Sequence, residues 1–549
     1  MLPGKVKKNG VLLFFLLVFL TISGCGKAPQ LFGVTITWTE GGVVEEKVNG
    51  EWVEPVLERN VESDTSIQLR AIADLDYIFS GWEVQGADHG DPKEGEITLT
   101  NFSSGALIKA NFDKGVLVHN AEELEDALDL QDDYDVIRFG ANITTEVNYD
   151  IILSSDGLIF DLNGYKLLVE PDFDFIVSGD NITLEGSEVE LQGEGYILIE
   201  GYDIIIKGLT IITEDQDFYI ETGGEVSLTI IDSDFSLGEG NFYLDAYNME
   251  NIEIFLTISG SSFSAKDFYI LSYTDKENIK TYINISDGSE FNLQNQFLID
   301  PYAQSGGELE MFISNSDVNL ENGQFWVYAD GSEQKINVKL TNSNLRIPQS
   351  NFTLKGTGND GEIYYEIKNC LIEVQNQFLY ETNGNNDIST LKIEGSTIEL
   401  GENPFFIDAD NPTVDLAVEI INSEFRLNDN EFKIVSPEGQ SDVKIKNSSF
   451  ENGSIFRIEA KTSLLETILF DTISSLSFLK DAVLNVVDFV QISALAIGSN
   501  ATLEIYDAYD DGVPIDEPGD LGNAIGIIFL ELNSEIIVYW EGDVVETIP

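Results

Sequence analysis

The chain has 549 residues and carries 97 Asp and Glu against 29 Lys and Arg, a formal net charge of −68 at pH 7. This charge argues against DNA, RNA and anionic lipid surfaces as partners, because binding to phosphate requires clustered Lys and Arg. Only two His and two Cys are present, which disfavours His/Cys zinc sites and disulfide scaffolds. Hydrophobic residues make up 43%, enough for a core, and the length predicts several domains or one long repeat array.

The first 24 residues have the pattern of an export signal. Three lysines among the first eight residues precede a run of 12 mainly apolar residues, from 11 to 22. This run is shorter than the ~20 residues that a membrane-spanning helix needs. It ends in Ile22-Ser23-Gly24-Cys25, which resembles the lipobox of bacterial lipoproteins. The resemblance implies cleavage after Gly24 and transfer of diacylglycerol to Cys25; the alternative is an ordinary secretory signal followed by a cysteine by chance.

Lipid at Cys25 would anchor the mature chain, with residues 25–31 as a lipidated tether. We therefore expect a protein of the cell envelope that faces outside the cytoplasm, at the outer membrane or the cell surface, with the membrane as a partner through the lipid. The residue after the cysteine is Gly26 rather than an Asp, and by the same resemblance this favours the outer membrane. With Cys25 acylated, Cys370 has no intrachain disulfide partner. We expect Cys370 to be a small packed residue rather than a nucleophile.

Residues 32–115 predict a small β module. Alternating segments at 32–38, 67–73, 77–82, 97–99 and 106–112 are typical of short strands, and Asn49-Gly50 predicts a hairpin turn. The pattern Tyr-x-Phe-x-Gly-Trp at 77–82, with a closing segment Ala-Asn-Phe at 110–112, resembles the internalin-type B repeat of bacterial surface proteins. The resemblance implies a spacer or a binding unit. For Phe79 and Trp82, the core of a small sandwich is favoured over a ligand platform.

A repeat fills most of the remaining chain. A corner motif of apolar-x-(Asn, Asp or Gly)-small-x-apolar recurs, for example at 313–318, 340–345 and 420–425, and successive corners are 22 to 28 residues apart. Asn, Asp and Gly tolerate the left-handed backbone conformation that a sharp corner requires. The corner residues are Gly164, Gly186, Gly208, Asp232, Gly260, Asp287, Asn315, Asn342, Asn369, Gly395, Asn422 and Asn447.

A phenylalanine follows most corners after eight to ten residues, within strand-like flanks and without helical periodicity. We predict an all-β fold, a parallel β-solenoid of about 12 or more coils. Its phenylalanine rings are expected to stack inside every ~4.8 Å, and its corner asparagines to hydrogen-bond from coil to coil. The phenylalanines are Phe218, Phe242, Phe268, Phe297, Phe325, Phe352, Phe378, Phe405, Phe432 and Phe456, and the asparagines are Asn315, Asn342, Asn369, Asn422 and Asn447.

The period, the corner residues and the segment Phe160-Asp161-Leu162-Asn163-Gly164 resemble right-handed parallel β-helices of the pectin-lyase type. The resemblance covers residues 116–500. It implies two enzymatic possibilities: lyases that use Arg or Lys as the base with calcium-binding acids, and hydrolases that use clustered Asp with a His and a basic pair.

Both ends of a solenoid require a cap, because an open coil exposes apolar side chains and unpaired strand edges. A helix is predicted near 120–130, with Asn120 as its N-cap and Glu123 three residues later, and its apolar face is suited to cover the first coil. We interpret residues 501–549 as the C-terminal cap, with strands at 525–532 and 535–540.

No catalytic constellation is visible. Both histidines, His89 and His119, precede the first corner, and after Gly164 the only arginines are Arg346, Arg426 and Arg457. We therefore predict no catalytic residue, no metal ligand and no required cofactor. The best candidate site for bound Ca²⁺ is one acidic segment. The alternative interpretation of this segment is a solvated loop whose charges repel one another. Its candidate ligands are Asp507, Asp510, Asp511 and Asp516.

Tyr243, Tyr269 and Trp326 directly follow ladder phenylalanines, so strict alternation turns them outward. A stripe of outward rings can stack on neutral sugars. The leading hypothesis is therefore a non-catalytic cell-surface lipoprotein with an adhesive role, which binds carbohydrate, cell-envelope material or a surface protein through the faces of the rod. The alternatives are a polysaccharide lyase or glycoside hydrolase on the same fold, and an envelope spacer without a ligand.

Overall fold

The computed structural model describes residues 30–145, 150–171, 173–222, 225–247, 252–277, 279–357, 359–382, 384–409, 411–436, 440–451, 455–459, 462–471, 473–478, 483–486, 488–489, 492–497, 502–506, 509–510, 513–514, 528–530, 535–540 and 543–549. It contains two compact units, 1–117 with 133–136, and 118–132 with 137–549. The predicted all-β fold is confirmed: the first unit is a small antiparallel β module, and the second is a right-handed parallel β-solenoid. Cys25 and the whole export signal lie outside the described residues.

The first unit is a sandwich of two sheets. In one sheet β1 pairs antiparallel with β4 and parallel with β9, and β9 pairs antiparallel with β6; the other has the order β3-β2-β5-β8-β7. The hairpin β2–β3 turns at Asn49-Gly50, where both residues have positive φ. The strands are β1 Leu31–Trp38, β2 Gly42–Val48, β3 Glu51–Val53, β4 Glu58–Glu62, β5 Ile67–Ala73, β6 Tyr77–Gln85, β7 Asp88–His89, β8 Glu96–Thr100 and β9 Ala106–Val118.

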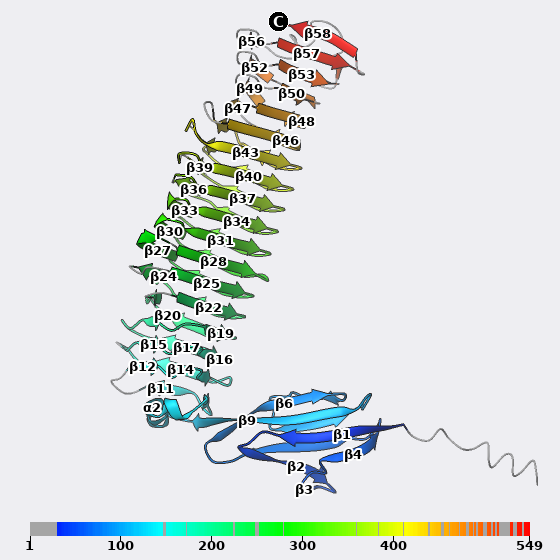
Figure 1. Ribbon diagram of the computed structural model, residues 1–549, viewed down its shortest axis with the longest axis vertical. Coiled ribbons are helices and arrows are strands. Elements are labelled where there is room, and N and C mark those ends of the chain that lie inside the picture. Colours follow the sequence, from blue (N-terminus) through cyan, green and yellow to red (C-terminus); the bar gives the residue numbers. More distant parts are fainter. Residues whose placement is uncertain are drawn as a thin grey trace, which may run out of the picture. The chain divides into compact units, whose positions relative to one another are not determined.

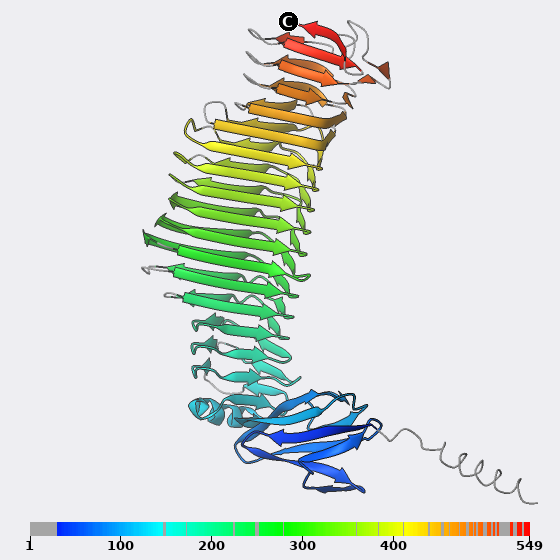
Figure 2. The same cartoon turned by 45° about the vertical axis from the view of Figure 1, so that its right-hand side comes forward.

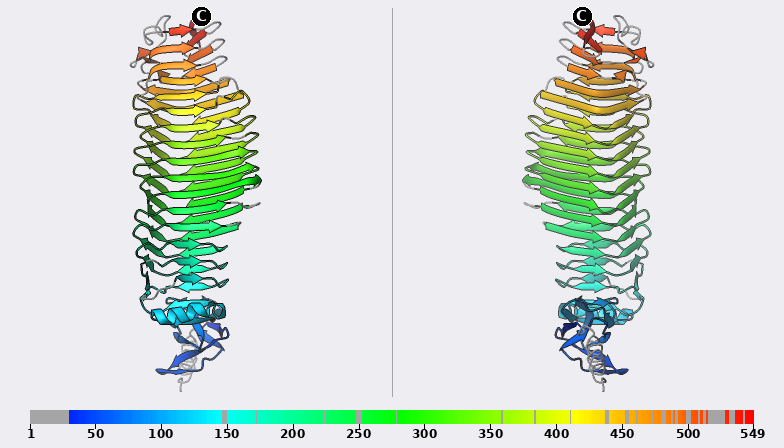
Figure 3. Two further views of the ribbon diagram at one scale, coloured as in Figure 1. Left: turned by 90° about the vertical axis from the view of Figure 1, so that its left-hand side faces the viewer. Right: turned by 90° about the vertical axis from the view of Figure 1, so that its right-hand side faces the viewer.

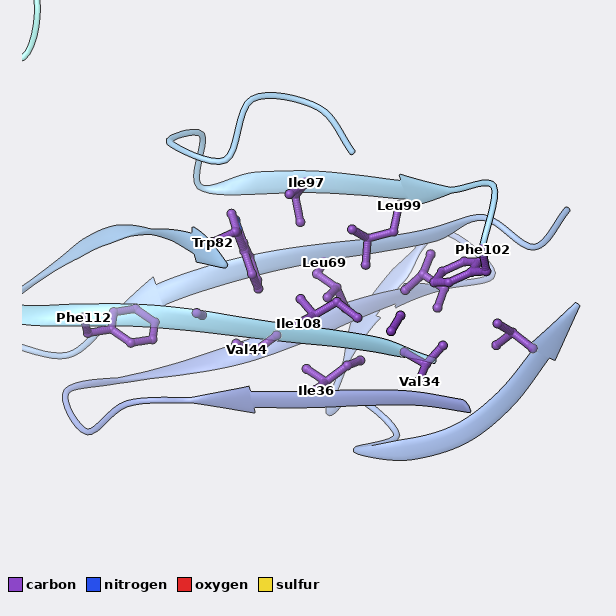
Figure 4. Packing of buried hydrophobic residues seen from close by; sticks show 14 residues of the cluster. Val34, Ile36, Val44, Leu69, Trp82, Ile97, Leu99, Phe102, Ile108 and Phe112 are labelled. Atoms are coloured by element: carbon purple, nitrogen blue, oxygen red, sulfur yellow. The ribbon is translucent and has the colours of Figure 1, made fainter. Parts of the chain in front are cut away.

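Apolar side chains from both sheets fill the inside of this sandwich (Figure 4). Trp82 is 5% exposed and points into the core, and its indole Nε1 donates to the Glu94 carbonyl oxygen at 3.0 Å. Phe79 lies beside it, with ring centroids 5.4 Å apart. Both aromatic residues are therefore parts of the core, which leaves neither as a ligand platform.

A short helix begins the second unit. α2 covers Ala121–Asp129 and is followed by the 3₁₀ helix η1, Gln131–Asp133. The Asn120 side chain accepts a hydrogen bond from the Glu123 N–H at 3.0 Å, as the predicted capping box requires. Leu124 and Ala127 are buried, and the helix contacts β11 (Ile143–Thr145) and β12 (Ile151–Leu153) of the first complete coil.

Each coil of the solenoid contains up to three short strands, one on each of three faces, and every strand pairs in parallel with its counterpart in the next coil (Figures 1 and 2). The first face consists of β10 Val136–Phe139, β13 Ile159–Asp161, β16 Thr183–Glu185, β19 Ile204–Lys207, β22 Glu225–Ile231, β25 Ile252–Ser259, β28 Ile279–Ser286, β31 Glu308–Ser314, β34 Lys335–Thr341, β37 Glu362–Lys368, β40 Ile388–Glu394, β43 Asp415–Ile421, β46 Gln440–Glu451, β48 Thr462–Asp471, β50 Val483–Val486, β53 Thr502–Tyr506 and β57 Glu535–Trp540.

The two other faces are narrower. The second face consists of β11, β14 Lys166–Val169, β17 Glu188–Leu191, β20 Thr210–Thr213, β23 Asp234–Ser236, β26 Ser262–Ala265, β29 Glu290–Leu293, β32 Asp317–Leu320, β35 Asn344–Ile347, β38 Leu371–Val374, β41 Thr397–Leu400, β44 Glu424–Arg426, the ends of β46 and β48, and β51 Asp488–Phe489. The third face consists of β12, β15 Phe175–Val177, β18 Ile197–Ile199, β21 Phe218–Thr222, β24 Phe242–Tyr247, β27 Phe268–Glu277, β30 Phe297–Ser305, β33 Phe325–Ser332, β36 Phe352–Thr357, β39 Phe378–Thr382, β42 Phe405–Asp408, β45 Glu431–Val435, β47 Ile455–Glu459, β49 Ile473–Phe478, β52 Ile492–Ile497 and β56 Ile528–Leu530.

A continuous stack of phenylalanine rings lies inside the third face. The ten rings from Phe218 to Phe456 are buried, and successive centroids are 4.5 to 5.2 Å apart in near-parallel planes. A second stack, Phe235–Phe263–Phe291, meets the first edge-to-face. Because the rings repeat at the spacing of neighbouring strands, the stack aligns each coil with the next. Figure 3 shows the resulting series of parallel coils.

The corner between the first and second faces is built as its residues predict. All twelve corner residues, from Gly164 to Asn447, have positive φ. The Asn342 amide donates to Asn315 Oδ1 at 3.3 Å, and the Asn369 amide donates to Asn342 Oδ1 at 3.1 Å. A buried serine follows most of these corners, and Cys370 occupies the same position in its coil.

Burial raises the pKa of the Cys370 thiol. Its Sγ also lies 3.3 Å from the Lys368 carbonyl oxygen. Cys370 is therefore a packed residue whose side chain stays a protonated thiol, whereas a nucleophile requires the thiolate.

The coils continue past the predicted boundary at residue 500. Beyond Asp442, paired residues in neighbouring coils are 19 or 20 positions apart rather than about 26, for example Asp442 with Thr462 and Leu464 with Val483. The corner motif has no room in this shorter coil, which is why the repeat becomes invisible in the sequence. The last described pairs, such as Thr502 with Glu535, are 33 positions apart. β58, Asp543–Ile548, pairs antiparallel with β57, and β54 Tyr509–Asp510 pairs with β55 Val513–Pro514.

We predict that Phe432→Ala lowers the free energy of unfolding by about 3–5 kcal/mol, because it removes a buried ring and leaves a cavity in the stack. The measurement is a urea titration followed by circular dichroism. Lys433→Ala, on the outward side of the same strand, is the matched control and should cost less than about 1 kcal/mol. Equal losses in the two variants would contradict the role assigned to the stack.

A polar cluster interrupts the apolar interior at β39–β40. Asp387 is fully buried; its Oδ1 accepts from the Gly361 N–H at 2.9 Å, whereas its Oδ2 has no hydrogen-bond partner among the described residues. Tyr380 and Ser389 share a hydrogen bond beside it. Burial raises the pKa of Asp387 to about 6. Ionisation of this carboxyl group therefore destabilises the folded chain.

We predict that the stability of the chain falls as pH rises from about 4 to about 6. In this range the unfolded chain has released the Asp387 proton, with an ordinary pKa of about 3.9, while the folded chain still holds it. Asp387→Asn, which resembles the protonated acid, should be more stable than the wild type by about 2–3 kcal/mol at pH 8, and similar to it near pH 4. Urea titrations at the two pH values test this, and an unchanged difference between them would contradict it.

Candidate functional site

Side chains on the outside of the solenoid form rows that run from coil to coil. Alternate residues of each strand are buried, and the strands are in register, so each outward residue lies beside its counterpart in the next coil. A face therefore repeats one kind of chemistry over several coils. The three faces differ in this chemistry, and each carries a groove.

The third face carries a row of tyrosines. Tyr219 and Tyr243 stack with centroids 5.1 Å apart, and Tyr269 meets Tyr243 at a steep angle, 5.5 Å away. A parallel row contains Tyr273 and Tyr302, stacked at 4.9 Å. The predicted outward rings are thus on this face, but Tyr243 and Tyr269 lie against each other, and Trp326 lies beside Tyr328 with ring centroids 5.9 Å apart. Ring edges and hydroxyl groups, rather than one continuous flat platform, are left for a ligand.

Carboxylates alternate with these rings. The Tyr219 hydroxyl donates to Asp245 Oδ2 at 3.3 Å, and the Tyr247 hydroxyl donates to Glu221. Burial raises the pKa of Asp245 above its ordinary value. Burial and the neighbouring charge of Asp267 raise the pKa of Tyr269 to about 12. This face is therefore acidic and keeps its phenols protonated at neutral pH.

A groove of about 580 Å³ opens at the start of the tyrosine row. We call it the tyrosine groove. Its charged lining residues are all acidic: Glu194, Asp215, Asp217 and Glu221. Tyr196 and Tyr219 supply its rings, and Tyr196 is 41% exposed.

The first face carries alternating lysines and glutamates. Lys280 pairs with Glu253 at 2.5 Å, and Lys444 pairs with Glu419 at 2.9 Å. The sequence alone showed no run of cations on one face, because these lysines are separated by whole coils. Their equal positions within successive strands were the signal that could have found them. The outward lysines of this face are Lys207, Lys280, Lys335, Lys339, Lys368, Lys392, Lys444 and Lys446.

A groove of about 440 Å³ lies on this face, and we call it the lysine groove. Lys335 and Lys339 line it and form no salt bridge with the described residues. The Lys339 ammonium lies 5.6 Å from the ring centroids of Phe312 and Tyr364. Three glutamates, Glu308, Glu310 and Glu362, also line the groove.

The second face carries a groove of about 760 Å³ with a different lining, which we call the amide groove. It extends over β26, β29, β32 and β35. Its only charged lining residues are Arg346 and Glu321. The polar remainder consists of Ser264, Asn292, Gln294, Asn319, Asn322 and Gln349. Sequence reasoning did not single out these residues.

The arginines and histidines are not arranged as a catalytic cluster. On the second face, Arg346 contacts Glu373 at 3.4 Å, and Arg426 contacts both Glu399 and Glu424. Arg457 belongs to the third face. His89 lies in β7 of the sandwich, and His119 Nδ1 contacts Glu123 Oε2 at 3.0 Å.

The described residues contain no group of three or more His, Cys, Asp and Glu side chains that could hold a metal ion. The calcium candidates stay untested: Asp507, Asp511 and Asp516 lie outside the described residues, and only the backbone of Asp510 is described, in β54. No helix among the described residues has the length and hydrophobicity to cross a membrane.

Comparison with known proteins adds no family to this description: no protein-family model and no curated protein matches the chain.

Proposed function

We propose that the chain is a non-catalytic cell-surface lipoprotein whose solenoid binds carbohydrate or other cell-envelope material. The observation that supports this proposal is the repetition on the outer faces. Rows such as Tyr219–Tyr243–Tyr269 offer similar groups at similar intervals over several coils. A polymer of repeating units can make equivalent contacts with each coil, and the sum of such contacts gives avidity. Catalysis, in contrast, requires a few unique groups at one point.

The lipid anchor is supported by the order of its signals in the sequence: lysines, a short apolar run and the lipobox ending at Cys25. Acylation of Cys25 would hold the protein at the outer membrane or the cell surface, with the solenoid outside the cytoplasm. Negative charge on the exported chain, with a formal value of −68 before cleavage, would keep it soluble there and oppose association between copies.

Cys25→Ser should move the protein from the membrane fraction to the soluble fraction, because the lipid has no other thiol to join at the lipobox. The measurement is fractionation with and without detergent, followed by immunoblotting. Cys370→Ser is the matched control and should leave the distribution unchanged. Persistent detergent-dependent partitioning of the Cys25→Ser variant would refute the anchor.

A specific observation favours carbohydrate-active catalysis as the second candidate. Lys335 and Lys339 both line the lysine groove, together with Tyr364 and Asn337. A lysine can act as a base or bind a carboxylate. The three glutamates in the same groove oppose an anionic sugar. We therefore rank this candidate below binding.

We expect purified 26–549 to bind polysaccharide on a glycan array and to release no reducing ends or unsaturated products, with or without Ca²⁺. Products that disappear in Lys339→Ala would establish catalysis in the lysine groove instead. If the array shows no binding and the assay shows no products, the role of an envelope spacer is the one that remains.

A further inference from the structure

We infer that the amide groove of the second face binds a linear, uncharged polysaccharide whose chain runs along the stack of coils. This inference rests on the proposed function and adds the place of binding and the chemical class of the ligand.

The groove follows the coils rather than crossing them. Ser264, Asn292, Asn319 and Arg346 are register partners on four successive coils, so they form one wall parallel to the stack. Neighbouring members of this row are separated by the strand spacing of ~4.8 Å. The residues after each strand, including Glu321, form the other wall. An extended chain therefore fits along this trough better than a compact ligand.

Charge separates the amide groove from the other two grooves. It contains one arginine and one glutamate, in a chain with a formal charge of −68. The tyrosine groove is lined by four carboxylates, and the lysine groove by five charged groups. A ligand without charge partly desolvates the charged groups of those two grooves and offers no opposite charge in return. In the amide groove an uncharged ligand avoids most of this cost.

The amides offer hydrogen bonds in both directions. The Asn319 amide nitrogen donates to Asn292 Oδ1 at 3.1 Å, and the Asn292 amide nitrogen donates to Glu290 Oε1 at 2.9 Å. This chain orients the side chains and leaves Asn319 Oδ1 as an acceptor. Asn322 and Gln349 are exposed, and their side-chain amides have no hydrogen-bond partner among the described residues. Sugar hydroxyls are donors and acceptors at once, so they match this mixed set.

The test uses residues 26–549, which lack the cysteine of the predicted anchor, and isothermal titration calorimetry with three hexasaccharide probes of different charge: neutral cellohexaose, acidic hexagalacturonate and cationic chitosan hexamer. Cellohexaose should bind, and its affinity should persist at about 1 M NaCl, where charge interactions are screened. A neutral malto-oligosaccharide and a mannan hexamer should be titrated as well, since uncharged chains differ in shape. Binding of at least one neutral probe, with no detectable acidic-probe binding, is the expected result.

The double variant Asn322→Ala/Gln349→Ala locates the site. Neither side chain has an internal hydrogen bond to lose, so the thermal melt should not change. Affinity for the neutral probe should fall about tenfold or more, since two hydrogen bonds to the ligand are lost. Lys433→Ala, on the third face and outside all three grooves, is the control and should change this affinity less than about twofold.

Each outcome decides a different statement. Neutral binding that the double variant retains would refute the amide groove while the proposed function stands. Binding of charged probes alone would refute the uncharged class. If no probe and no glycan on the array binds, the proposed function fails, and this inference fails with it.

Discussion

The register between coils is the constraint on which the rest of the solenoid depends, and the buried phenylalanine stack maintains it. Ten rings lie 4.5 to 5.2 Å apart along the inside of the third face. A shift of one residue in any strand would turn its ring outward and its polar neighbours inward. Eleven of the twelve corners with positive φ, from Gly164 to Asn422, follow the end of a first-face strand, so they act in the same sense as the rings.

Fixed register has an electrostatic consequence, because a residue type that recurs at one position of the repeat lies beside its own copies. Acidic rows would then repel along their whole length. The first face meets this by alternating Lys280, Lys335 and Lys392 with glutamates. The second face inserts uncharged Asn292 and Asn319. On the third face Glu221 and Asp245 are neighbours in one row, and each accepts a hydrogen bond from a tyrosine hydroxyl. Lysines, side-chain amides and phenol hydroxyls are therefore three ways in which the faces offset negative charge within their rows or beside them.

Features that depend on one coil could be predicted, and features that depend on several could not. Asn315, Asn342 and Phe325 each mark a corner or an inward position within their own coil, and spacing alone revealed them. The amide groove requires Asn292, Asn319 and Gln349 from different coils, which become neighbours only when the register is known. The final coils escaped prediction because their spacing departs from the repeat, first to 19 or 20 residues and then to 33. In the sandwich, β4 escaped because its charged sequence does not alternate.

The same reasoning bears on the choice between binding and catalysis. The rows make each face nearly periodic, so a long ligand has many equivalent positions on it. Such a face favours retention and sliding of the ligand over its fixation in the single position that a reaction requires. A catalytic site must break the period by placing different groups at one point. The lysine groove breaks it most, since Lys339 lies between Phe312 and Tyr364 without a carboxylate partner among the described residues. The amide groove breaks it least, because its wall repeats short polar side chains over three coils before Arg346. Retention of an extended polymer along the second face is thus the function that the repeat itself favours, whereas catalysis would have to arise where the repeat is interrupted.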